Sequence, residues 1–187
     1  GLSKESSELW LWMARNRLNL CGSTAYTHPL AKKLGLISRM GGHIFEALLD
    51  PDRILASGRS IWEDHPEWYG QLEKGKPAKE TAFKTQFCVS QPKLLDYLGQ
   101  ELVRRIAQEY HPADRLDIWN FDTWGSVCQC DQCRSLGNGA DRALYFLSKL
   151  RQVINDALRD GRLDHDVQLV TNGYEGTCTI EGPQNPI

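Results

Sequence analysis

Helix-like stretches alternate with short apolar segments along most of the chain. The clearest helical pattern follows Ser90 and Pro92, which are a candidate cap and a first-turn proline. Its apolar stripe repeats every four residues, at Leu94, Leu98, Leu102, Ile106 and Tyr110. A second amphipathic helix is predicted over residues 141–159, where Gly161 ends it. Shorter helices are predicted at residues 8–16 and 29–35.

Apolar segments between these helices are predicted to be strands. They cover residues 17–21, 36–45, 85–89, 115–121 and 167–171. This alternation predicts repeated βα units and a parallel sheet. Residues 46–84 break the pattern with several prolines and glycines, so we interpret them as one long excursion or lid loop. Loops of this length in compact domains are usually functional.

Two architectures fit this order of elements. A doubly wound sheet expects a Gly-rich nucleotide turn after its first strand, and residues 21–25 contain neither G-x-G-x-x-G nor a P-loop lysine. A complete (β/α)8 barrel needs about 250 residues, whereas this chain has 187. We therefore predict an α/β fold, with residues 1–187 as a single segment from the central part of a (β/α)8 TIM barrel with outer helices.

Composition and charge argue against some classes of function. The chain is 41% hydrophobic and 25% charged, as in an ordinary globular domain. Its net charge of −2 is spread without long blocks, which argues against nucleic acid as a partner. Its apolar runs are far shorter than the roughly 20 residues of a membrane span, so no membrane contact is predicted.

Polar and aromatic residues collect where the predicted strands end, and βα loops converge at that edge in either architecture. They are Gly41, Gly42 and His43, then Asn120, Asp122 and Trp124, then Asn172, Tyr174 and Glu175. Two carboxylates, Asp122 and Glu175, fit the paired acids of a glycosidase, and the aromatic rings can stack on sugars. The alternative is that Asp122 caps a turn and Glu175 is a solvated loop residue.

Two histidines, His43 and His65, have competing interpretations. His43 either hydrogen-bonds a substrate hydroxyl or is a satisfied core residue. His65, in the segment HPEWY, belongs either to a lid over the strand ends or to an aromatic anchor for the long excursion. His28, His111 and His165 lie in predicted turns and are interpreted as surface residues.

The most specific local motif is a C-x-C-x-x-C run formed by Cys128, Cys130 and Cys133. Three thiolates at this spacing suit tetrahedral zinc, with Cys88 as the natural fourth ligand. A disulfide, between Cys130 and Cys133 or to a distant partner, is also open. A redox-active Cys130–Cys133 pair is less consistent with the sequence, because it lacks the thioredoxin-like placement at a helix start after the first strands.

Several segments together resemble a bacterial family known as domain of unknown function 4838, whose members are similar to glycoside-hydrolase TIM barrels such as alpha-glucuronidases. The matching segments are RNRLN (15–19), GHIFEALL (42–49), HPEWY (65–69), QFCVSQP (86–92) and residues 120–133. Their order and spacing extend over about residues 9–180. The family pattern reads Asn, Asp, Gly before its cysteine run, where this chain has Asn120, Phe121 and Asp122.

The resemblance implies a secreted or periplasmic carbohydrate-active protein, with the remainder of the barrel outside this chain. We predict a glycoside hydrolase-like protein acting on a polysaccharide or glycan, with Asp122 and Glu175 catalytic. His43, Asn120, Trp124, Asn172 and Tyr174 are expected to bind the substrate. No cofactor is expected for catalysis. Cys88, Cys128, Cys130 and Cys133 can hold structural zinc or form disulfides, since the implied compartment is oxidising. The alternative is a non-catalytic carbohydrate-binding module with a structural cysteine site.

Overall fold

The strands form one parallel sheet in the computed structural model, which describes residues 4–22, 29–72, 75–111, 113–123, 126–178 and 182–185. They are β1 (Leu20–Gly22), β2 (Ile37–Gly42), β3 (Arg115–Ile118) and β4 (Gln168–Val170). The spatial order is β1-β2-β3-β4. Leu116 lies between Met40 and Leu169 in the parallel register. The α/β class and the parallel neighbours are confirmed, and the described strands form an open sheet.

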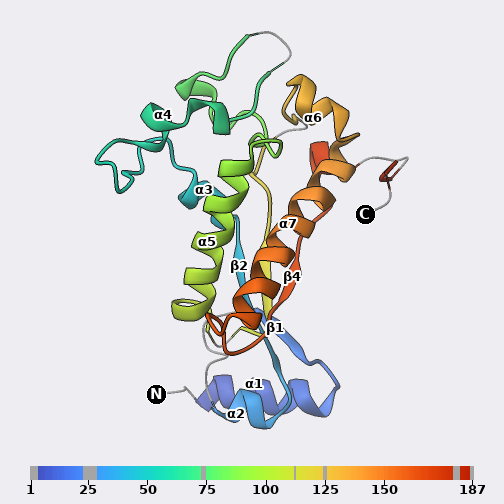
Figure 1. Cartoon of the computed structure of the whole chain (residues 1–187). Helices are drawn as coiled ribbons and strands as arrows, with labels where there is room; N and C mark the ends of the chain where they lie inside the picture. The colour runs from blue at the N-terminus through green and yellow to red at the C-terminus, as the bar shows by residue number, and fades with distance from the viewer. Residues whose placement is uncertain are drawn as a thin grey trace.

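Two long helices and several short ones accompany the sheet. They are α1 (Lys4–Arg15), α2 (Pro29–Lys33), α3 (Ile44–Leu48), α4 (Ile61–Asp64), α5 (Pro92–Gln108), α6 (Asp131–Ser135) and α7 (Gly139–Arg159). The 3₁₀ turns are η2 (Pro66–Trp68), η3 (Lys79–Thr81) and η4 (Glu175–Thr177). Figure 1 shows α5 and α7 side by side over the strands, with α1 and α2 at one end and α4 and α6 at the other. None of the described helices is long and apolar enough to cross a membrane.

The main core lies between α5, α7 and one face of the sheet. The predicted α5 stripe is completely buried at Leu94, Leu98, Leu102 and Ile106. Leu116 and Ile118 of β3, two positions apart and so on one face, belong to the same cluster. Burying each such side chain contributes about 1.5–3 kcal/mol. A smaller cluster of Trp10, Ala31 and Leu36 joins α1 and α2.

The opposite face of the sheet is polar. Arg39 of β2 and Asp117 of β3 form an ion pair with Nε and Oδ2 2.7 Å apart. Asp117 is buried, and its other carboxylate oxygen, Oδ1, has no hydrogen-bond partner among the described residues. Arg115, two positions before Asp117, lies on the same face. One face of this sheet therefore packs against helices while the other carries charge.

The predicted strand at residues 36–45 is too long. β2 ends at Gly42, and Ile44 already begins α3. Gly41 and Gly42 have φ angles of +99° and +132°, in a region that side chains disfavour, and they turn the chain out of the sheet. A Cβ on Gly41 would lie 2.2 Å from the Asp117 carbonyl oxygen, so only glycine permits this approach of β2 to β3.

The strand predicted at residues 85–89 is wrong. The Gln86 amide donates to the Ser126 carbonyl at 3.1 Å, and the Cys88 amide donates to the Trp68 carbonyl at 2.8 Å. These amides bond to loops rather than to the sheet, although the segment is buried. The expected Ser90 cap is also corrected, because Gln91 precedes α5 without a side-chain cap.

The long excursion over residues 46–84 contains α4 and two 3₁₀ turns. A capping box between Ser60 and Glu63 starts α4. Trp68 and Tyr69 are buried, and the Tyr69 hydroxyl donates to the Leu49 carbonyl at 2.9 Å. The HPEWY segment is therefore an aromatic anchor for the excursion.

The contact between α5 and α7 depends on Gly99. A Cβ there would lie 2.9 Å from Val153 Cγ2, so we expect Gly99→Leu to force the helices apart and to destabilise the protein by about 2 kcal/mol or more. Ala107→Leu, at an exposed position of the same helix, should change stability by less than about 0.5 kcal/mol. Urea unfolding followed by circular dichroism measures both, and equal effects would contradict the close-packing explanation.

Candidate functional site

His43 lies at the carboxyl end of β2. Its Nδ1 is 2.7 Å from the Asn120 carbonyl oxygen. A carbonyl only accepts, so Nδ1 carries the proton and the tautomer leaves Nε2 as an acceptor. The Trp119 ring meets the imidazole edge to face, with centroids 5.1 Å apart. β2 and β3 thus hold His43 in a defined orientation, and Asn120 contributes through its backbone.

Two acidic residues follow the strand ends that hold this histidine. The Asp122 amide donates to Glu46 Oε1 at 2.9 Å, which joins the end of β3 to the first turn of α3. Only Cα and Cβ stand between that amide nitrogen and the Asp122 carboxyl carbon, so the two carboxyl groups lie within about 7 Å of each other. Asp122 is exposed and Glu46 half-buried. This pair includes Glu46, which was not among the predicted site residues.

Gln86 holds the backbone next to Asp122. Its Nε2 donates to the Phe121 carbonyl at 2.7 Å, and its Oε1 accepts from the Phe121 amide at 2.9 Å. Both bonds are buried, and the Phe121 ring contacts Phe87 edge to face. The loop after β3 is therefore fixed by a side chain from a distant segment. Gln86 is a positioning residue that no sequence pattern indicated.

The segment after β4 is attached to its neighbours. Thr171 Oγ1 donates to the Ile118 carbonyl at 3.2 Å, and Thr177 Oγ1 donates to the Tyr174 carbonyl at 2.8 Å. Asn172 is half-buried and Tyr174 exposed. Within the described residues, no hydrogen bond links either one to His43. Trp124 and the Glu175 side chain lie outside the described residues, so their predicted roles stay predictions.

The four predicted cysteines converge on one buried site. Their sulfur atoms all lie within 4.8 Å of one another. Cys88 Sγ is 3.6 Å from Cys130 Sγ and 3.7 Å from Cys133 Sγ. All four are free thiols. Sulfurs at the corners of a tetrahedron around zinc, with bonds of about 2.3 Å, are about 3.8 Å apart. This cluster can therefore hold a metal ion.

Surrounding groups orient the sulfurs. The Gln71 amide donates to Cys128 Sγ at 3.3 Å, and the Cys133 amide donates to Cys130 Sγ at 3.4 Å. Arg142, itself buried, donates to the Cys128 carbonyl at 2.6 Å. Backbone amides aimed at sulfur are the second layer of contacts that tunes a thiolate metal site.

Hydrogen bonds between the thiols move their pKa values apart. The pKa of Cys128 is lowered, because the Cys133 and Cys88 thiols both donate to its sulfur. The pKa values of Cys88 and Cys133 are raised, because their protons are engaged by Cys128. Binding of a metal ion displaces such protons. Cys133 is fully buried, which does not suit the exposed thiol that the redox interpretation requires.

Comparisons with known proteins give little further guidance. No family model matches the chain, and no curated protein matches it. One solved structure is similar, the GH36 alpha-galactosidase AgaA from Geobacillus stearothermophilus in complex with 1-deoxygalactonojirimycin. It shares 15% identity at a TM-score of 0.35, over 76% of this chain and 18% of that chain. A TM-score this low does not establish a common fold.

Removing the Gln86 side-chain amide tests its positioning role. Gln86→Leu leaves the buried Phe121 amide unpaired, whereas the Phe121 carbonyl keeps its bond from the Thr123 amide at 2.9 Å. We therefore expect a loss of about 1–3 kcal/mol of stability. Hydrogen exchange at the Phe121 and Asp122 amides should accelerate. The control Gln132→Leu, exposed on α6, should change neither quantity. Unchanged exchange at Phe121 in Gln86→Leu would contradict the role.

Proposed function

We propose that this chain is part of a glycoside hydrolase-like (β/α)8 barrel that acts on a polysaccharide or glycan. The observation that carries the proposal is the bond from the Asp122 amide to Glu46, which brings these two acidic residues together after β3 and β2, the strands whose ends also hold His43. In a glycosidase, one carboxyl group protonates the leaving oxygen and the other attacks the sugar or activates water.

The sheet itself supports an incomplete barrel. β1 and β4 are edge strands with one partner each, and exposed edges are normally paired or covered. The polar face carries Arg39 and Asp117, and Asp117 Oδ1 is buried with no partner in the part of the chain that the structure describes. Such an oxygen is costly unless a donor reaches it. We propose that further barrel strands, outside this chain, close the edges and supply that donor.

The residues have distinct proposed roles. Asp122 is the catalytic acid or nucleophile, and Glu46 is the partner carboxylate that the geometry favours. Glu175 stays the partner predicted from the sequence. His43 presents Nε2 to a substrate hydroxyl, and Asn120, Trp124, Asn172 and Tyr174 line the sugar subsites. The protein is proposed to be secreted or periplasmic, in keeping with the family resemblance.

We also propose that the four cysteines bind structural zinc. Four sulfurs at near-tetrahedral spacing, backbone amides directed at two of them and burial of the cluster all support this. No catalytic role is assigned to the ion. It joins the segment after the long excursion to the loop that follows β3, next to the candidate carboxylates.

Zinc content tests the metal proposal. Elemental analysis of the purified protein should give about one zinc per chain, and thiol counting after chelation and unfolding should recover all six cysteines of the chain, the four of the cluster included. Cys88→Ser should reduce zinc affinity at least about tenfold. The matched control Cys178→Ser, at an exposed cysteine, should keep the zinc. Absence of zinc together with missing thiols would favour disulfides instead.

Asp122→Asn tests the catalytic proposal in the complete polypeptide that contains the rest of the barrel. The substitution keeps the shape but removes proton transfer or attack, so hydrolysis of a cleavable glycan should fall about 100-fold or more while sugar binding largely survives. Glu46→Gln should also reduce turnover. Asp131→Asn, exposed on α6, serves as the control.

Hydrolysis that survives Asp122→Asn would overturn the assigned role. If the protein binds glycan without any hydrolysis, and Asp122→Asn has no effect on that binding, the carbohydrate-binding module becomes the better account.

A further inference from the structure

Two histidines and an aspartate meet at the end of the sheet opposite the candidate active site. His111 lies between α5 and β3, whereas Asp164 and His165 lie between α7 and β4. Because β3 and β4 are parallel neighbours, both connections enter the sheet at the same end. The Gln168 amide donates to the Asp114 carbonyl at 2.9 Å and joins the two connections. Neither of the functions proposed above uses this cluster.

The Asp164 carboxylate stands between the two imidazoles. Its Oδ2 is 3.1 Å from His111 Nε2, and its Oδ1 is 2.8 Å from His165 Nδ1. One donor atom from each residue lies within 4.8 Å of the others, and the imidazole centroids are 4.9 Å apart. His165 Nε2 is buried without a partner among the described residues, so Nδ1 is the nitrogen that can reach a ligand.

The charge of the cluster suits a cation. Nearby Arg151 is paired with Asp166, and Arg162 with Asp160. In the part of the chain that the structure describes, no lysine or arginine forms an ion pair with Asp164. Among the described residues, a cation at this cluster would therefore meet the Asp164 carboxylate without a competing lysine or arginine.

We propose that His111, Asp164 and His165 bind a divalent transition-metal ion, of the class of zinc or nickel. Imidazole nitrogen suits these ions, whereas calcium and magnesium favour ligand sets made of oxygen. Ligand bonds of about 2.0–2.2 Å require the donor atoms to draw closer than they are. The His111 and Asp164 side chains are 55% and 72% exposed, so they have room to move. Solvent completes the coordination, and the ion joins the connections that precede β3 and β4.

Nickel titration tests the site independently of the cysteine cluster. The protein is freed of any polyhistidine tag and loaded with one molar equivalent of zinc, which the four cysteines bind more tightly than the histidine cluster, and Ni²⁺ is then added in a calorimeter. We expect one nickel ion per chain, with shifted and broadened imidazole NMR signals from His111 and His165. Excess Mg²⁺ should not compete. His111→Gln and Asp164→Asn should each weaken nickel binding about tenfold or more.

The matched control is His65→Gln. His65 is also paired with one carboxylate, Glu67 at 3.1 Å, but none of the other described histidines contacts that pair. This variant should bind nickel as the parent does, and the melting temperature of each variant checks folding. Nickel affinity that persists in both His111→Gln and Asp164→Asn, or that falls equally in His65→Gln, would overturn the proposal.

Discussion

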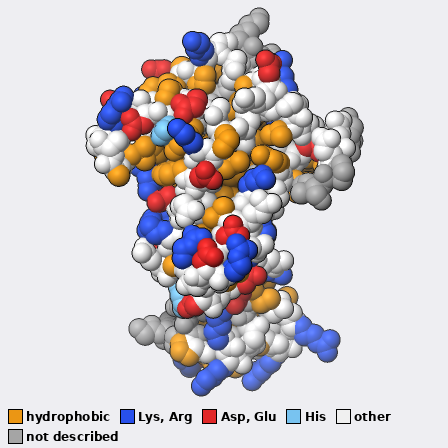
Figure 2. Space-filling model, in the orientation of Figure 1, with side chains coloured by type: hydrophobic (Ala, Val, Ile, Leu, Met, Phe, Trp, Pro, Cys, Tyr) orange, Lys and Arg blue, Asp and Glu red, His pale blue; other side chains and the backbone are white. Residues whose placement is uncertain are grey.

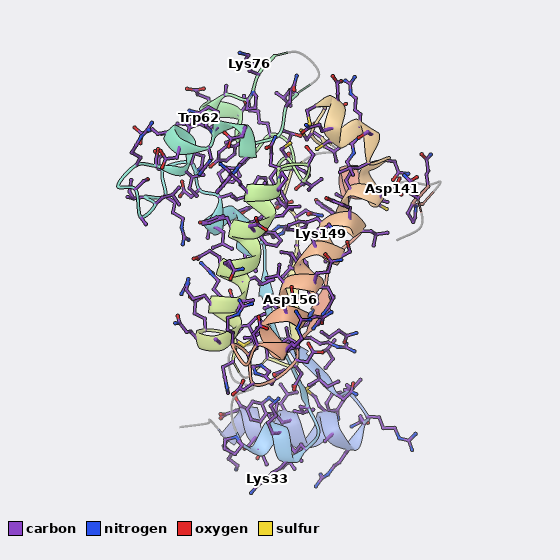
Figure 3. All side chains as sticks on the ribbon, in the orientation of Figure 1. Lys33, Trp62, Lys76, Asp141, Lys149 and Asp156 are labelled. Carbon is purple, nitrogen blue, oxygen red and sulfur yellow. The ribbon has the colours of Figure 1, made fainter. Side chains whose placement is uncertain are left out.

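The packing of α5 and α7 against one face of the parallel sheet is the constraint on which the rest of the structure depends. α5 and α7 each return the chain to the start of the next strand. The loops that follow the strands therefore lie at one end of the sheet, and the loops that precede the strands lie at the other end. Figure 2 shows apolar side chains gathered over the upper part of one face and mixed charges over the lower part. The candidate carboxylates and the cysteines lie at the first end, and the histidine cluster lies at the second. Figure 3 shows α7 extending between the ends, with Asp141 near one and Asp156 toward the other.

Helices whose apolar residues recur at a regular spacing were predictable from the sequence. The leucines of α5 recur every four residues because one stripe of the helix must be buried, and all of them are. The strand expected at residues 85–89 fails because apolar, β-branched residues suit any buried extended segment, and only tertiary contacts decide whether it joins a sheet. Cys88 nevertheless converges with the C-x-C-x-x-C run as predicted.

The site was predictable only in part, for a physical reason. His43 was found because it follows two glycines at a strand end, a local pattern. Glu46 and Gln86 act through hydrogen bonds to a loop 76 and 35 positions away. Such bonds do not produce a repeating pattern in the sequence, because they depend on which segments the folded core brings together. The three residues of the histidine cluster, interpreted as surface residues where they were considered, were missed for the same reason.

The cysteine cluster also bears on the order of folding. Cys88 and Cys133 are 45 positions apart, and α5 and β3 lie between them. The sulfurs acquire a common geometry only after α5 has docked and β3 has paired, and closing so long a segment carries an entropic cost that local contacts do not offset. The cluster is therefore completed late. An ion bound there stabilises the native state more than the transition state for folding, so its main kinetic effect is to slow unfolding.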